Sequence, residues 1–118
     1  QNSLSSDEAA ASLQGIESAI AYIKEHYAED LTRGAIARAV HMSGSHFSRC
    51  FRMVTNTSYT DYVIEFRMKK AMELLKTSLS IQEIAQRVGY SNANRFTINF
   101  RHYASCTPTE YRTNLRRG

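Results

Sequence analysis

At 118 residues and 42% hydrophobic composition the chain is long enough for one globular domain, and no apolar run approaches the roughly 18 residues of a membrane-spanning helix. Two cysteines, Cys50 and Cys106, do not form a disulfide framework, which favours a reducing cytoplasm. Residues 1–30 hold six acids and one base (−5), whereas residues 31–118 hold 14 bases and five acids (+9), so the basic part is a candidate for binding a polyanion.

The spacing of apolar residues predicts an all-α fold with seven helices. Only one proline and five glycines occur, and apolar residues recur at intervals of three and four along most of the chain. A hydroxyl residue with an acid three positions later marks helix starts at Ser5, Ser58, Ser80 and Thr107. The predicted helices cover residues 7–27, 33–40, 44–54, 59–77, 81–87, 92–103 and 108–115.

The predicted helix 59–77 has a separate apolar stripe in each half. The stripe of the first half is Tyr59, Tyr62, Val63 and Phe66, and that of the second half is Met68, Ala71, Met72 and Leu75. The stripes start nine residues apart, which is about 180° round the axis at ~100° per residue, so each half is expected to pack on a different partner. The chain is therefore interpreted as a single unit with a first subdomain (1–57), a linker helix (58–78) and a second subdomain (79–118).

An internal repeat supports this division. The motif Ile-Ala-x-x-Val-x-x-Ser occurs at residues 36–43 and again, 48 positions later, at 84–91. Each copy continues into Phe-x-x-x-Phe-Arg, at 47–52 and 96–101. A short helix, a tight turn and a three-turn helix make a helix-turn-helix, whose second helix can enter a DNA major groove, so the repeat predicts two such modules.

The outward faces of the two second helices are rich in hydrogen-bond donors and lack acids. In the first copy they consist of Ser45, His46, Ser48, Arg49 and Arg52, and in the second of Asn92, Ala93, Asn94, Arg95, Thr97, Ile98 and Arg101. Such faces suit phosphates and base edges, whereas an ordinary solvated face mixes Glu with Lys. Apolar periodicity alone is equally typical of a helical protein-interaction or RNA-binding module, which is the alternative interpretation.

No catalytic site, cofactor or metal is predicted. The sequence has no Gly-rich phosphate loop and no cluster of carboxylates, so an enzyme is disfavoured. His46 and Cys50 lie four residues apart and could share a metal, but structural zinc sites have four ligands and no second pair accompanies them. Packing in a helix is the favoured interpretation of both residues.

Over residues 16–113 the chain resembles the AraC/XylS family of bacterial transcription regulators. The resemblance rests on motifs in both modules, the linker helix and the last helix, namely 43–52, 62–75, 80–90, 96–103 and 107–112. It implies a DNA-binding output domain that activates or represses promoters, with activation as the favoured expectation and with double-stranded DNA and RNA polymerase as partners. Since the sequence starts at Gln1 without an initiator Met or a secretory signal, it is interpreted as the C-terminal part of a longer protein with an N-terminal sensor or receiver domain.

The resemblance also implies roles for individual side chains. The residues expected to face bases are Ser45, His46, Ser48, Arg49, Ala93, Asn94, Arg95, Thr97 and Ile98. The residues expected to contact phosphates are Thr32, Arg52, Ser91, Asn92 and Arg101. Arg49 on guanine and Asn94 on adenine are the best individual candidates because both side chains can bond bidentately.

A few positions differ from what the turns and the family pattern favour. His41 takes the left-handed position of the first turn that Gly89 takes in the second. Asn56 stands where the family usually has Gly, and residues 104–106 are Ala-Ser-Cys where it usually has Phe-Gly and an apolar residue. Ile98 replaces a residue that is often Arg or another polar residue, which makes the readout of the second module harder to infer.

Overall fold

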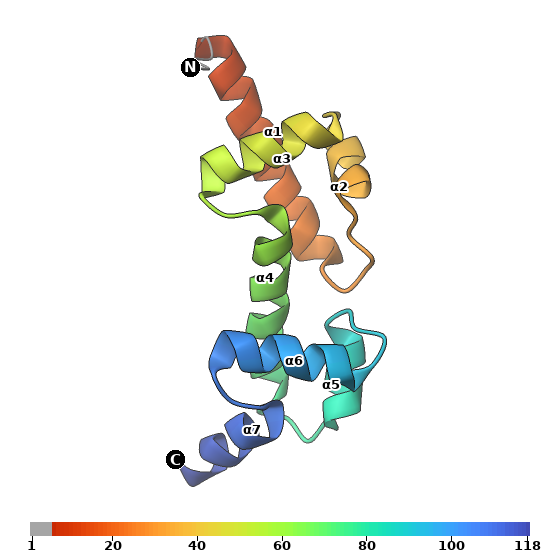
Figure 1. Cartoon of the computed structure of the whole chain (residues 1–118), viewed down its shortest axis with the longest axis vertical. Coiled ribbons are helices and arrows are strands. Elements are labelled where there is room, and N and C mark those ends of the chain that lie inside the picture. The colour runs from red at the N-terminus through yellow and green to blue at the C-terminus, as the bar shows by residue number, and fades with distance from the viewer. Residues whose placement is uncertain (1–5) are drawn as a thin grey trace. The chain divides into compact units, whose positions relative to one another are not determined.

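The computed structural model describes residues 6–118, which form seven α-helices and no strand (Figure 1). The predicted all-α class is confirmed. The helices are α1 (Ser6–His26), α2 (Arg33–Ala39), α3 (Gly44–Thr55), α4 (Tyr59–Leu74), α5 (Ile81–Arg87), α6 (Ala93–Ala104) and α7 (Pro108–Arg117).

Most predicted helix ends agree within two residues, but the predicted end of α4 at residue 77 is wrong. The helix ends at Leu74, because the N–H groups of Lys76 and Thr77 bond to the carbonyls of Glu73 and Leu74, only three residues back. Such bonds tighten the chain into a 3₁₀-type turn and end the α-helix. The linker helix thus has 16 residues instead of 19.

Side-chain caps begin the helices that follow loops. Ser80 and Thr107 each form a complete capping box with an acid three residues on, as predicted, and the Ser58 hydroxyl accepts from Asp61 N–H. The predicted cap at Ser5 lies outside the described residues. Asn92, predicted as the first residue of its helix, is instead the N-cap of α6, because its backbone is extended and its side chain accepts the N–H groups at 94 and 95.

The chain divides into two compact units, and the border lies within α4. The first unit consists of residues up to 26 together with 31–62, and the second of 27–30 together with 63–118. Each unit contains one helix-turn-helix with the helices that flank it. The start of α4 thus belongs to the first unit, and the rest of α4 to the second.

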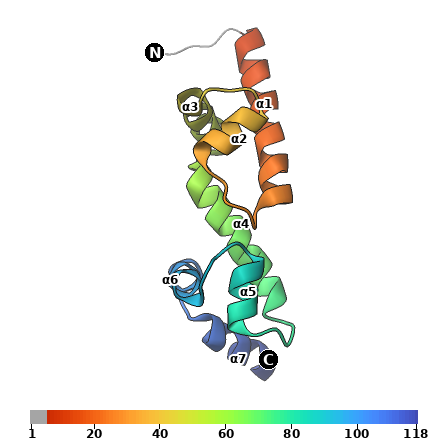
Figure 2. The same cartoon turned by 90° about the vertical axis from the view of Figure 1, so that its right-hand side faces the viewer.

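In the first unit α1, α2 and α3 pack against one another (Figure 2). Its buried hydrophobic residues are Ile16, Ala19, Ile23, Ile36, Ala37, Phe47, Cys50 and Phe51. The ring of Phe47 meets Tyr59 at 5.6 Å, and that of Phe51 meets Tyr62 edge-on at 5.5 Å. Tyr59 and Tyr62 of the first-half stripe of the linker helix therefore contact α3. Val63 and Phe66 of the same stripe belong instead to the second unit, where the ring of Phe66 meets that of Tyr27 at 5.3 Å, so the expectation that the whole stripe packs on one partner is wrong.

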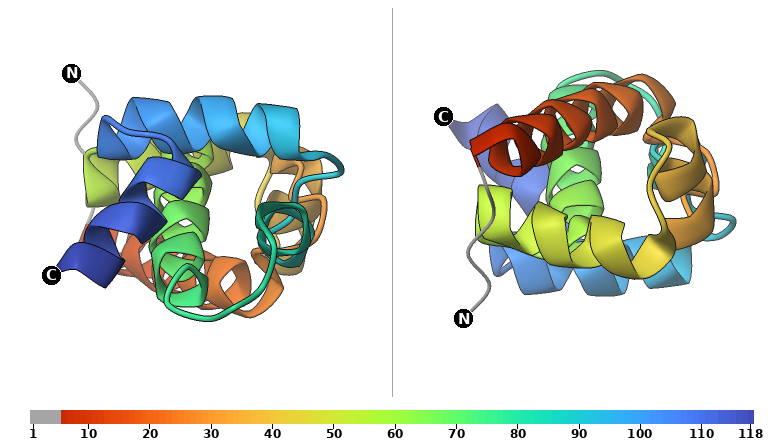
Figure 3. Two further views of the ribbon diagram at one scale, coloured as in Figure 1. Left: turned by 90° about the horizontal axis from the view of Figure 1, so that it is seen from below. Right: turned by 90° about the horizontal axis from the view of Figure 1, so that it is seen from above.

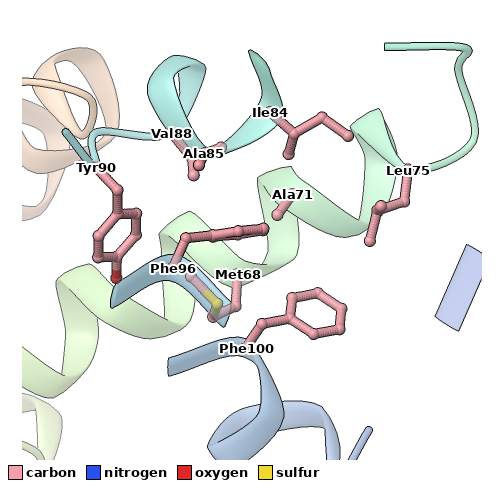
Figure 4. Packing of buried hydrophobic residues seen from close by; sticks show 9 residues of the cluster. All are labelled: Met68, Ala71, Leu75, Ile84, Ala85, Val88, Tyr90, Phe96 and Phe100. Carbon is pink, nitrogen blue, oxygen red and sulfur yellow. The ribbon is translucent and has the colours of Figure 1, made fainter. Parts of the chain in front are cut away.

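In the second unit α6 runs across the unit from α5 to α7 (Figure 3). Figure 4 shows its core, which is built by α4, α5, α6 and the residues that directly follow α4 and α5, namely Met68, Ala71, Leu75, Ile84, Ala85, Val88, Tyr90, Phe96 and Phe100. The second-half stripe of the linker helix is thus buried here. Tyr111 of α7 meets Phe100 edge-on at 5.6 Å, with an interplanar angle of 79°, the same angle as between Phe51 and Tyr62.

The turns of the two modules have the same hydrogen bonding although their residues differ. His41 has φ 60° and Gly89 has φ 106°, so both left-handed positions are confirmed. The N–H after each of them bonds to the carbonyl five residues back, in Ala37 and Ala85, at 2.9 Å in both copies. Asn56 also takes a left-handed conformation, with φ 62° at the end of α3.

We predict that Gly89→Ala lowers the free energy of unfolding by about 1–3 kcal/mol, because an L-residue is strained at this backbone conformation. A Cβ at Gly89 would also lie 2.8 Å from Cζ of Arg67, whose Nε–H donates to Tyr27 O at 2.7 Å. Gly34→Ala is the matched control, since its Cβ would meet nothing nearer than 3.9 Å, and it should be neutral or stabilise by up to ~1 kcal/mol. Urea unfolding gives the free energy of unfolding of each variant. An equal loss of stability in Gly89→Ala and Gly34→Ala would contradict the prediction.

Candidate nucleic-acid interface

The second helix of each module is here called its recognition helix, and in the first module this is α3. The apolar side of α3 determines which of its side chains reach solvent. Phe47 and Phe51 are fully buried, and they hold that side against the rest of the unit. Ser45, Arg49 and Arg52 are consequently exposed. An α-helix turns about 100° per residue, so the burial of two residues four apart determines which side of the helix reaches solvent.

The exposed side of α3 borders an open hollow of about 660 Å³. The hollow is lined by Arg33, Ser45, Ser48, Arg49, Arg52, Met53 and Asn56. Four of these residues are among the predicted DNA contacts. Three arginines and no acid line the hollow, so it is suited to an anion.

His46 lies differently from its predicted partners. It is half-buried, and its ring nitrogens lie 3.6 and 3.7 Å from Sγ of Cys50, which donates toward the Ser12 hydroxyl at 3.7 Å. His46 lines a second hollow of about 380 Å³ together with residues of α1 and the first turn. Among the described residues no group of three or more His, Cys, Asp or Glu side chains is arranged to hold a metal.

The second recognition helix, α6, repeats the arrangement of α3 with different residues. Phe96 and Phe100 are fully buried, whereas Asn94, Arg95 and Ile98 are exposed. Ile98 is 64% exposed, so an aliphatic side chain stands in solvent on this face. The remaining predicted base-facing residues, Ala93 and Thr97, are half-buried.

The predicted phosphate contacts are exposed, and two of them also cap helices. Thr32 Oγ1 accepts from the N–H at 35, and Asn92 Oδ1 accepts from the N–H groups at 94 and 95. Capping engages their acceptor atoms, while the hydroxyl hydrogen and the amide NH₂ group can still donate to a phosphate oxygen. Ser91, Arg52 and Arg101 are exposed as well.

Two features of these faces were not predicted from the sequence. Arg33 of α2 reaches across the start of α3, where a Cβ at Gly44 would lie 3.0 Å from its Nε. The glycine directly after the N-cap of α3 is the signal that could have revealed this contact. Asn99 of α6 donates to the hydroxyl of Tyr90 at 2.8 Å, which joins the recognition helix to the turn before it.

Three acidic side chains of α4 and α5 have partners outside the recognition helices. A hydrogen bond from the backbone N–H of Ser80, followed by an interaction with the Ser80 side chain, lowers the pKa of Glu83, whose carboxylate caps α5. Glu65 and Glu73 pair with Lys69 and Lys70 within α4. The exposed sides of α3 and α6 themselves contain no acid.

Two helix-turn-helix modules with acid-free recognition faces define a tandem helix-turn-helix DNA-binding domain. A family model described as "Helix-turn-helix domain" matches residues 36–114. The chain belongs to this AraC-type family, whose members are DNA-binding transcription regulators, and the resemblance to the AraC/XylS family is confirmed.

Curated and solved relatives agree with this assignment. The chain is 32% identical over 108 residues to the HTH-type transcriptional activator RhaR of Mannheimia succiniciproducens, covering 91% of this chain and 39% of the relative. The C-terminal domain of the response regulator AraT from Geobacillus stearothermophilus matches with TM-score 0.83 and 33% identity, over 85% of this chain and 84% of that one. The DNA-binding domain of AdpA, solved in complex with a target DNA, matches with TM-score 0.82 and 29% identity, over 86% and 93%.

These similarities support DNA binding in transcription regulation and not the alternative of a protein-interaction or RNA-binding module. The relatives include uncharacterised as well as named proteins, and they are transcription regulators. The chain spans about a third of the length of most of the curated relatives it matches, and 58% of one from Pseudoalteromonas carrageenovora. In the described part of the chain no helix is both long enough and apolar enough to cross a membrane.

Proposed function

We propose that this domain reads two unlike half-boxes of double-stranded DNA, with α3 and α6 in successive major grooves, and so regulates bacterial transcription. The observation that carries the proposal is shared by the two helices. Each buries a Phe pair on one side and exposes a side rich in donors and free of acids. DNA phosphates and base edges are matched by such a side, because they present negative charge and acceptors.

The residues of α3 are proposed to read the first half-box. Ser45, His46, Ser48 and Arg49 face the bases, and the exposed guanidinium of Arg49 suits O6 and N7 of guanine. His46 would have to turn from its contact with Cys50 to reach a base edge. Polar donors are the most discriminating groups in the major groove, so this half-box is expected to have the stronger sequence preference.

The residues of α6 are proposed to read the second half-box. Asn94 suits adenine N6 and N7, with Arg95 and Thr97 as further polar contacts, while Ala93 and Ile98 suit the methyl group of thymine. The exposure of Ile98 supports this role, because such a contact would remove its apolar surface from water.

Phosphate contacts are proposed to orient both helices. Thr32 and Arg52 would contact the backbone at the first module, and Ser91, Asn92 and Arg101 at the second. Helix starts and exposed arginines are ordinary donors to phosphate oxygens, and these contacts fix register without reading sequence.

The domain is further proposed to be the output part of a longer regulator in the bacterial cytoplasm, where the chromosome lies. AraT is a response regulator, and RhaR is a transcriptional activator. By this analogy a sensor or receiver domain precedes the DNA-binding domain, and the protein activates promoters together with RNA polymerase. The analogy also supports a regulator without catalytic activity of its own.

We expect Arg49→Ala to weaken binding to the best site by about 1–3 kcal/mol and to relax the preference at one base pair, because a bidentate guanine contact is local. Arg101→Ala is the matched control, since loss of a phosphate contact should weaken all sequences by a similar factor. Affinities for a set of single-base variants of the site give both results. An unchanged preference in Arg49→Ala would show that α3 does not place Arg49 on a base.

We expect one chain to select a non-palindromic site, because the faces of α3 and α6 present different residues. Selection from a randomised duplex library should return two unlike half-boxes in one fixed order, and a footprint of the isolated domain should cover both. A twofold-symmetric site that needs two chains would contradict the proposal, as would protection confined to a single groove.

A further inference from the structure

Arg33 is brought to the first recognition helix by the fold. It is the first residue of α2 and lies 11 positions before Gly44, the first residue of α3. A Cβ built on Gly44 would lie 3.0 Å from Nε, 3.4 Å from Cζ and 3.6 Å from Nη2 of Arg33. A Cβ at position 44 would therefore crowd the guanidinium, which would have to move by a few tenths of an ångström.

The hollow that Arg33 reaches has no negative charge of its own. Arg33, Arg49 and Arg52 line it together with two serines, a methionine and an asparagine, and none of the three arginines has an ion pair in the described part of the chain. Three unpaired guanidinium groups around one hollow repel one another, so an anion that enters it is stabilised.

The position of Arg33 indicates which part of DNA it would meet. It belongs to the first helix of the helix-turn-helix, and in this motif the first helix crosses the DNA backbone while the second lies in the groove. Arg49 is on the second helix, in the middle of α3. Arg33 is thus expected beside phosphates, whereas Arg49 is expected beside bases.

We infer that Arg33 and Arg52 together bind a backbone phosphate of DNA beside the first recognition helix, and that the missing side chain of Gly44 leaves room for Arg33 there. The inference rests on the proposed function and adds to it a phosphate contact from α2. Through this contact Arg33 would fix the register of α3 on DNA without reading a base.

The test compares Arg33→Ala, Gly44→Ala, the double variant and Arg38→Ala. Arg38 is an exposed arginine of the same helix that does not line the hollow, so its loss controls for the removal of one charge. Fluorescence anisotropy gives the dissociation constant on the selected duplex and on a scrambled duplex over a series of salt concentrations. Thermal melting followed by circular dichroism checks that each variant folds.

Arg33→Ala is expected to weaken binding about tenfold on both duplexes and to reduce the magnitude of the log–log salt slope by about one. Arg38→Ala should have a clearly smaller effect. Gly44→Ala should weaken binding in the wild-type background by less than Arg33→Ala does, since the new Cβ crowds Arg33, but should add nothing to Arg33→Ala. That non-additivity is a readout that a general loss of stability would not produce.

Three results would overturn the inference. Arg33→Ala and Arg38→Ala could have equal effects, Arg33→Ala could change the preference at one base pair, or Gly44→Ala could weaken both backgrounds equally. In each case a wild-type domain that still prefers its selected site leaves the proposed function intact. If the wild-type domain shows no preference for any duplex, the proposed function itself fails.

Discussion

The contact on which the rest of the structure depends is the edge-on packing of a phenylalanine of each recognition helix against a tyrosine of the following helix. Phe51 meets Tyr62, and Phe100 meets Tyr111, with interplanar angles of 79° in both units. Together with the buried Phe one turn earlier, this contact fixes the rotation of the helix about its own axis. The residues available to DNA follow from that rotation, because each step along an α-helix turns by about 100°.

The two modules also share the geometry of their turns and of the helix ends before them, although the residues differ between the modules. His41 and Gly89 both adopt left-handed conformations at the turn, although only glycine does so without a steric cost. Arginines then bind the carbonyls at the ends of the helices that precede the modules. Arg67 donates to Tyr27 O and Glu29 O, and Arg112 donates to Leu75 O and Thr77 O. The repeat in the sequence is therefore also a repeat of tertiary contacts.

Local sequence signals were sufficient to predict much of this fold. Capping residues such as Ser80 and Thr107 place helix starts. A positive φ was anticipated at His41, Asn56 and Gly89, but not at Ser105, which has φ 65° at the end of α6. These features depend on neighbours within a few residues, which explains why a single sequence reveals them.

Contacts between residues that are far apart in the sequence could not be predicted from local signals. The tight turn that ends α4 before the predicted residue is accompanied by a bond from Arg112, 37 residues away, to Leu75 O, which the local pattern could not reveal. The approach of Arg33 to Gly44 and that of Cys50 to Ser12 likewise depend on how helices cross. The roles of individual side chains on DNA stay predictions, since they depend on a second molecule.

The central claim is that the domain combines phosphate binding with sequence readout. It is tested most directly by the affinities of the isolated domain for a selected duplex and a random duplex, each measured over a salt series. Contacts to roughly six to ten phosphates predict a log–log slope of about −5 to −9, together with binding to the selected site at least ~10³-fold tighter than to the random duplex. A slope near zero, or equal affinity for the two duplexes, would contradict the account.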